Sequence, residues 1–70
     1  MSESVHLLVE SAVQIAWDFL EASGEIVDGY ETSRLLVKEI GKMTLTGERR
    51  KIMLANRAIE AYRKNRQKAA

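Results

Sequence analysis

Residues 47–66 read GERRKIMLANRAIEAYRKNR and combine the longest helical pattern in the chain with its densest positive charge. At 100° per residue, the apolar side chains of this stretch fall in one broad arc, which is typical of an amphipathic helix rather than a strand. These side chains are Ile52, Leu54, Ala55, Ala58, Ile59, Ala61 and Tyr62. We therefore predict a helix over about residues 47–66 with one buried side.

The opposite side of this helix carries Arg50, Arg57 and Lys64 at seven-residue spacing, which places three cations in one nearly straight row. We expect Thr44 or Thr46 to cap the start of the helix, because threonine is favoured at that position. Three cations at residues 49–51 then fall in the first turn, where they oppose the helix dipole.

Such a conflict with a local rule often marks a functional site, and a helix start ringed by cations suits a phosphate or a carboxylate. The candidate partner or anion surface comprises Arg49, Arg50, Lys51, Arg57 and Lys64. We favour the alternative interpretation, in which these side chains pair with the protein's own acids or lie in solvent.

Apolar periodicity predicts two further helices, over about residues 3–22 and 30–43. In the first, apolar residues fill more than half of the helical wheel, with Ser2 or Ser4 as the cap and Gly24 as the left-handed residue that ends it. Asp28 and Glu31 resemble a capping box at the start of the second. Its buried stripe is expected to contain Ser33, Leu36, Val37, Ile40 and Met43. The residues after 66 are expected to fray.

Composition describes one small domain over residues 1–70, because 46% of the 70 residues are apolar and 30% are charged. The fold class is all-α, a three-helix domain. A core of this size is marginally stabilising, so we expect the chain to pack as a homodimer.

The residue inventory argues against an enzyme, a cofactor or a metal site. The chain contains no cysteine and a single histidine, His6, so the common zinc sites and any disulfide are excluded. The acidic residues do not follow the calcium-loop spacing, and there is no nucleophile with a base nearby in the sequence. No catalytic residue, cofactor-binding residue or metal ligand is therefore assigned.

Charge is distributed very unevenly along the chain. Residues 1–33 hold seven acidic residues and no Lys or Arg, whereas residues 34–70 hold eleven basic and three acidic residues. Because the two charges nearly cancel, we interpret them as segments that attract each other when the chain folds or pairs. We find no secretory signal and no span of membrane length, so we expect a cytoplasmic protein without membrane contact.

The preferred function is a small non-enzymatic helical interaction or regulatory protein that self-associates. The first and third helices have apolar arcs wider than the stripe that one core needs, and a symmetric dimer would bury the excess. The candidate dimer interface comprises Val9, Val13, Trp17, Leu54, Ala58 and Ala61. For Trp17, at the margin of its arc, packing within the chain is favoured over contact with a second subunit.

The alternative function is nucleic-acid binding through the basic third helix. Its seven candidate cations are Arg49, Arg50, Lys51, Arg57, Arg63, Lys64 and Arg66. A helix-turn-helix is disfavoured, because the position ten residues after Val37 is Gly47 instead of a branched apolar residue. An aromatic platform for single strands is also missing. A third possibility is an acidic protein partner that docks on the same cationic row.

Overall fold

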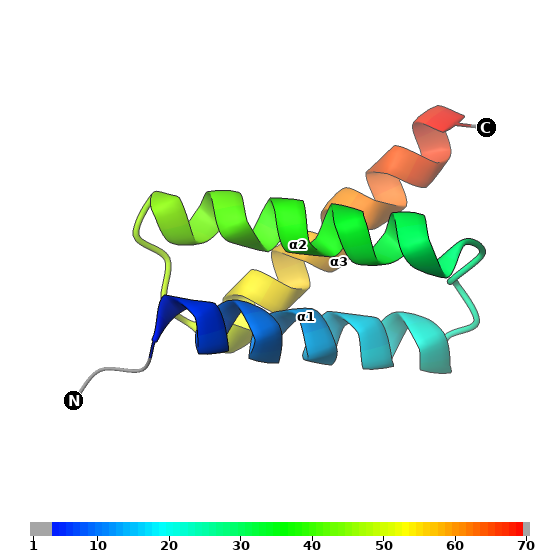
Figure 1. The fold of residues 1–70 in the computed structure, drawn as a ribbon. Coiled ribbons are helices and arrows are strands. Elements are labelled where there is room, and N and C mark those ends of the chain that lie inside the picture. Colours follow the sequence, from blue (N-terminus) through cyan, green and yellow to red (C-terminus); the bar gives the residue numbers. More distant parts are fainter. Residues whose placement is uncertain (1–3, 70) are drawn as a thin grey trace.

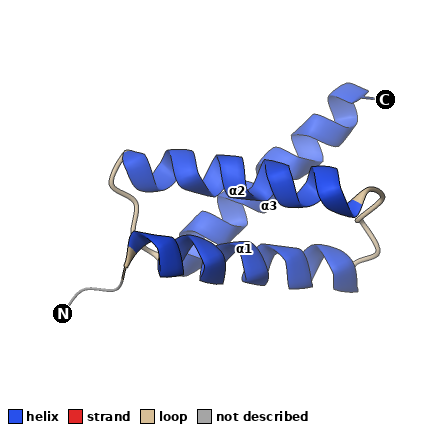
Figure 2. Ribbon diagram, in the orientation of Figure 1, coloured by secondary structure: helices blue, strands red, loops and turns tan. Residues whose placement is uncertain are grey.

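Three helices make up the fold, α1 (Val5–Ala22), α2 (Gly29–Leu45) and α3 (Lys51–Ala69). The computed structural model describes residues 4–69, and no strand occurs among them (Figure 2). The predicted all-α three-helix domain is therefore confirmed.

The helices pack against one another in all three pairs. α1 and α2 run antiparallel and side by side, while α3 crosses behind both at a steep angle (Figure 1). The C-terminal end of α3 extends beyond α2 in the same view. One side of the α1–α2 pair is thus covered by α3, and the other side is not.

The core lies where the three helices meet. Its residues are Leu8, Ala12, Ala16 and Leu20 from α1, Leu36 and Ile40 from α2, and Leu54, Ala55, Ala58, Ile59 and Tyr62 from α3. Four of these residues are alanines that are fully buried, and such small side chains allow the helix backbones to approach closely. Most of the apolar arc of α3 is buried because α3 contacts both other helices. Ile52 is an exception to the predicted buried side, since it is 61% exposed, and Ala61 is half-buried.

The buried stripe of α2 differs in part from the predicted one. Leu36 and Ile40 are buried as expected, but Thr32 and Thr44 complete the stripe, while Val37 is 48% exposed. The two threonines tolerate burial because each hydroxyl donates to a backbone carbonyl of its own helix, Thr32 to Asp28 and Thr44 to Gly41, both at 2.7 Å. Val37 consequently turns toward the open side of the α1–α2 pair.

The predicted caps Ser4 and Asp28 and the end of α1 at Ala22 are confirmed. The Ser4 hydroxyl accepts from the backbone N–H of His6, and the Asp28 carboxylate accepts from that of Glu31. Gly24 has a φ of 70° after α1. The alternative cap Ser2 and the predicted helix start at residue 3 lie outside the described residues.

α3 begins four residues later than predicted, and the assignment of Thr44 and Thr46 is wrong. Thr44 lies within α2 and Thr46 is the C-cap of α2, followed by Gly47 with a φ of 104°. Arg49 and Arg50 therefore precede α3 instead of occupying its first turn, which starts at Lys51. α3 also continues to Ala69, past the predicted end, because Gln67, Lys68 and Ala69 are good helix formers.

Both interhelical connections begin with the same hydrogen-bonding pattern. After α1, the N–H groups of Gly24 and Glu25 donate to the carbonyls of Glu21 and Leu20. After α2, those of Gly47 and Glu48 donate to Thr44 and Met43. These are Schellman motifs, which require a left-handed residue at the glycine.

Within residues 4–69, none of the helices is both long and apolar enough to cross a membrane.

Candidate interaction surfaces

An open hollow of about 590 Å³ runs along the outer side of the α1–α2 pair. A smaller hollow continues it toward the C-terminal end of α1. We call the two together the α1–α2 groove. Its lining residues are His6, Val9, Glu10, Ser11, Val13, Gln14 and Trp17 from α1, and Ser33 and Val37 from α2. Because α3 contributes none of them and covers the opposite side (Figure 1), the groove faces away from α3.

Apolar side chains that the core leaves partly open lie in this groove. Val9, Val13 and Trp17 are half-buried and pack against the core from its margin. The indole of Trp17 lies over the start of α2, where a Cβ added at Gly29 would be 3.4 Å from its Cη2 atom. Trp17 therefore packs within the chain and still presents surface to the groove.

The other predicted interface residues lie elsewhere. Leu54 and Ala58 are fully buried between the three helices, so they have no surface with which to contact a second chain. Ala61 is half-buried on α3 and does not line the groove. The sequence interpretation assigned Val37 to the core and so missed it as a groove residue; its position one residue after the buried Leu36 was the available signal.

Among residues 4–69, one acidic residue, Glu10, lines the groove. α1 carries Glu10, Asp18 and Glu21 and no Lys or Arg. Glu10 accepts from the exposed His6 ring, with Nε2 and Oε2 separated by 3.0 Å. The cations of α2 lie away from the groove. Arg34 and Lys38 line a separate hollow with Tyr62 and Asn65 of α3, and Lys42 pairs with Glu39 of its own helix at 3.6 Å.

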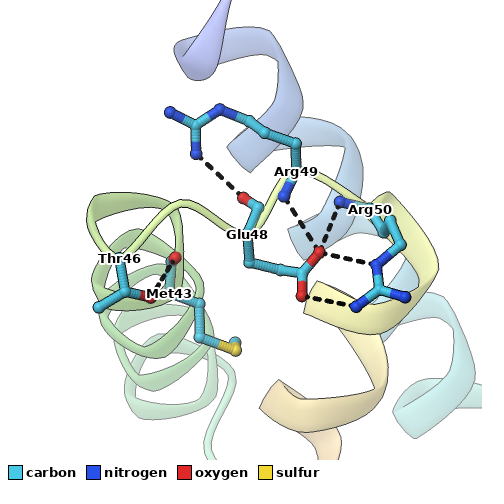
Figure 3. A network of polar contacts seen from close by, with 5 residues as sticks. All are labelled: Met43, Thr46, Glu48, Arg49 and Arg50. Carbon is cyan, nitrogen blue, oxygen red and sulfur yellow. Dashed lines mark hydrogen bonds and ion pairs between the residues drawn. The ribbon is translucent and has the colours of Figure 1, made fainter.

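A second hollow, of about 630 Å³, lies between the end of α2 and the start of α3. It is lined by Met43, Thr46, Gly47, Glu48, Arg49, Arg50 and Arg57. Figure 3 shows that the Glu48 carboxylate lies beside the Arg50 guanidinium, while the Arg49 guanidinium donates to the Glu48 carbonyl. The Oε2 atom of Glu48 accepts from the backbone N–H groups of Arg49 and Arg50, at 3.1 and 2.9 Å. The Arg50 guanidinium donates to both carboxylate oxygens, at 3.1 and 3.2 Å.

Glu48 thus fills the position before α3 that was predicted to suit an anion. The hydrogen bonds from the Arg50 side chain, and then from the backbone, lower the pKa of Glu48 from 4.5 to about 2. The same carboxylate raises the pKa of Arg50. Arg49 is also engaged, because its Nη1 donates to the carbonyl of Thr44 at 2.7 Å. Two of the predicted surface cations therefore bind groups of the protein itself.

The C-terminal half of α3 is bound to the first connection through Glu25. The Arg63 guanidinium donates to both oxygens of the Glu25 carboxylate, at 2.9 and 2.7 Å. The Glu25 carbonyl accepts from the Tyr62 hydroxyl at 2.7 Å and from Arg66 Nη1 at 2.9 Å. We call this group of four residues the Glu25 clamp. Arg63 lowers the pKa of Glu25, mainly through its side-chain hydrogen bonds.

The remaining predicted cations differ in their surroundings. Arg57 and Lys64 are exposed, and neither forms an ion pair with any residue in the range 4–69. Arg57 borders the hollow beside Arg49 and Arg50. Lys51, the first residue of α3, is half-buried.

No cluster of three or more His, Cys, Asp or Glu side chains suitable for a metal ion occurs in the described part of the chain. Comparison of the whole sequence with protein-family models and with curated proteins, and of the fold with solved structures, gave no match.

Proposed function

We propose that this chain is a small non-enzymatic helical interaction protein that self-associates through the α1–α2 groove. The observation that carries the proposal is that Val9, Val13, Trp17 and Val37 keep exposed apolar surface on the side of the α1–α2 pair that α3 does not cover.

The chemistry of the groove suits contact between proteins. A partly open tryptophan beside valines offers apolar surface whose removal from water contributes about 25 cal/mol per Å². Aromatic residues are enriched in the centres of protein interfaces, where charged residues are depleted. No Lys or Arg among residues 4–69 lines the groove, and Glu10 is its one acidic lining residue in that range.

A second copy is the simplest partner because the core of one chain is small. A 70-residue domain buries a smaller fraction of its surface than a larger one, and association compensates for this. A symmetric pair would cover the same groove on both copies at once.

Val37→Glu tests this proposal, because Val37 is 48% exposed and its replacement does not disturb the core. We expect light scattering to give twice the chain mass of 7.9 kDa for the natural sequence and the single mass for the variant. A buried unpaired carboxylate should weaken the dimer by at least about tenfold.

Val27→Glu is the matched control, since Val27 is 78% exposed in the first connection and does not line the groove. This variant should remain dimeric, and circular dichroism should show equal helix content for both variants. A natural sequence that keeps the single chain mass at about 1 mM would overturn the proposal, because specific dimers have lower Kd values than this.

We propose an acidic protein partner for the exposed cations of α3 as a second candidate function. Arg57 and Lys64 support it, because no acid within residues 4–69 pairs with them. Nucleic-acid binding receives less support, since Arg50, Arg63 and Arg66 already bind oxygens of the chain. In an amide NMR titration with a short DNA duplex, we expect shifts in α3 at low salt only. Shifts that persist at physiological salt would favour nucleic acid instead.

A further inference from the structure

We infer that the hollow between the end of α2 and the start of α3 binds an acidic segment of a partner protein, whose carboxylates contact Arg49 and Arg57. We call this hollow of about 630 Å³ the arginine hollow. The inference rests on the acidic partner proposed above for the cations of α3, and it specifies where that partner binds. It is independent of self-association, because no residue of the arginine hollow lines the α1–α2 groove.

The charge of the arginine hollow is only partly balanced by the chain itself. Within residues 4–69, three arginines and one glutamate line it, which leaves a net charge of +2. Glu48 pairs with Arg50, at 3.1 Å between Oε2 and Nε. Neither Arg49 nor Arg57 forms an ion pair with any residue in the same range. An acidic group from another molecule would therefore meet two uncompensated cations here.

Arg49 is held in position and still has donors available. Its Nη1 donates to the carbonyls of Thr44 and Glu48, at 2.7 and 3.0 Å, whereas Nε and Nη2 have no hydrogen-bond partner within residues 4–69. Because carbonyl groups are neutral, they fix the guanidinium without cancelling its charge. A guanidinium binds a carboxylate through two parallel hydrogen bonds. Fixing Arg49 in advance also reduces the entropy that is lost when a ligand binds.

Arg57 supplies the second contact from the opposite direction along the chain. It is exposed and lies on α3, whereas Arg49 precedes this helix. Both side chains nevertheless line the one hollow. Two cations that the fold brings together from a connection and a helix can bind neighbouring carboxylates of one segment.

The lining favours a protein segment over a nucleic acid. The half-buried Met43 belongs to it, and a thioether side chain can pack against the methylene groups of an incoming Glu. The position of Glu48 shows that a carboxylate suits the donors at this end of the molecule. A nucleic-acid backbone gains affinity from many cations at once, whereas this hollow offers two that are uncompensated.

Arg57→Gln tests the inference, because Arg57 is exposed and unpaired within residues 4–69, so its replacement should leave the fold intact. The probe is a hexaglutamate peptide, which is added to the isotopically labelled chain at physiological salt and followed by amide NMR. We expect shifts of residues 46–50 and 57. Removing one exposed, bidentate ion pair should raise the Kd of the peptide about fivefold.

Arg34→Gln is the matched control, since it removes the same charge from another exposed and unpaired arginine. Arg34 lines the separate hollow with Tyr62 and Asn65, beyond the arginine hollow. This variant should change the Kd by less than about twofold, because exposed charges that are far from the ligand are screened by salt.

Four outcomes would overturn the inference, and they separate it from the proposal on which it rests. Equal effects of Arg34→Gln and Arg57→Gln would show that the peptide responds to total charge alone. Shifts confined to Lys64 and the residues after it would overturn the arginine hollow and keep the acidic partner. No shift of any amide at about 10 mM hexaglutamate would overturn both, because such a Kd is too weak for specific binding. A short DNA duplex that shifts residues 46–50 and 57 at physiological salt would assign the hollow to nucleic acid instead.

Discussion

Tyr62 shows how a single side chain joins distant parts of this small fold. It is 5% exposed, and its hydroxyl donates to the carbonyl of Glu25, 37 residues away. The ring thus belongs to the core, while the hydroxyl satisfies a carbonyl at the end of the first Schellman motif. A buried tyrosine usually needs such a partner, because an unpaired hydroxyl is costly to bury.

Tyr62→Phe should lower the free energy of unfolding by about 1 kcal/mol, the typical net value of one such hydrogen bond. The loss stays moderate because the Glu25 carbonyl still accepts from Arg66. Tyr30→Phe is the matched control, since Tyr30 is 70% exposed and should have almost no effect. Urea unfolding of both variants measures the difference, and equal midpoints would contradict this role of the hydroxyl.

The Glu48 carboxylate should respond to pH in a defined direction. Its pKa is about 2 in the folded chain and has an ordinary value of 4.5, so it stabilises the fold fully above pH 4.5. This stabilisation is lost as the pH falls from 4.5 through about 2. We expect an NMR titration of the Glu48 carboxyl carbon to have its midpoint near 2.

Arg50→Gln should move that midpoint toward 4.5, because the hydrogen bonds of the Arg50 side chain are the main cause of the low pKa. Arg57 lines the same hollow but is not among the causes of the low pKa of Glu48. Arg57→Gln is therefore the control and should leave the midpoint nearly unchanged. A midpoint near 4.5 in the natural sequence would show that the network of Figure 3 does not persist in solution.

At the scale of the helix, both connections rely on a hydroxyl residue, a glycine and a glutamate in succession. Ser23-Gly24-Glu25 follows α1, and Thr46-Gly47-Glu48 follows α2. In each, the glycine adopts the left-handed conformation and the glutamate binds an arginine. The first glutamate binds an arginine 38 residues away, whereas the second binds one only two residues away.

Glycine substitutions in α2 and its connection should have opposite effects. Gly47→Ala places a Cβ at a φ of 104° and should destabilise the fold by about 1 kcal/mol through backbone strain alone, since nothing lies within 4 Å of that position. Gly41 lies inside α2, and a Cβ added there would also have nothing within 4 Å. Gly41→Ala should therefore stabilise the helix by about 0.5–1 kcal/mol. Thermal unfolding of both should show midpoints on either side of the natural value.

The features of these helices that could be predicted are those set by residues close together in the sequence. Helical periodicity and the caps at Ser4 and Asp28 were readable because each involves residues within one turn. The start of α3 was not, because Thr46 and Glu48 resemble a helix start by residue type. Only the left-handed Gly47 reveals that they complete the end of α2. The burial of Thr32 and Thr44 was missed because their hydroxyls bond to their own helix.

At the scale of the whole molecule, the wide apolar arcs of α1 and α3 are buried to different extents. Most of the arc of α3 is buried because α3 crosses both other helices, and Leu54 and Ala58 have no exposed surface, whereas Ile52 at the start of α3 is exposed. The arc of α1 contacts α2 and α3 and still leaves Val9, Val13 and Trp17 half-buried. A helical wheel gives the width of an arc but not the number of neighbours that cover it, so the sequence alone did not separate the two.

Self-association should make thermal stability depend on concentration. If a dimer buries the α1–α2 groove, the unfolding midpoint rises with chain concentration by mass action. We expect this rise for the natural sequence and its absence for Val37→Glu in calorimetry between about 10 μM and 1 mM. Val27→Glu should behave like the natural sequence, and a concentration-independent midpoint in both would oppose the dimer.

The Glu25 clamp has a consequence for the time course of folding. It joins residues 37 to 41 positions apart, whereas the contacts around Glu48 join residues one to five apart. Closing a longer loop costs more entropy, so we expect the clamp to form after the transition state. Stopped-flow measurements on Arg63→Gln should then show faster unfolding with a nearly unchanged folding rate. The clamp would thus determine how long a folded molecule survives and have little influence on how quickly it forms.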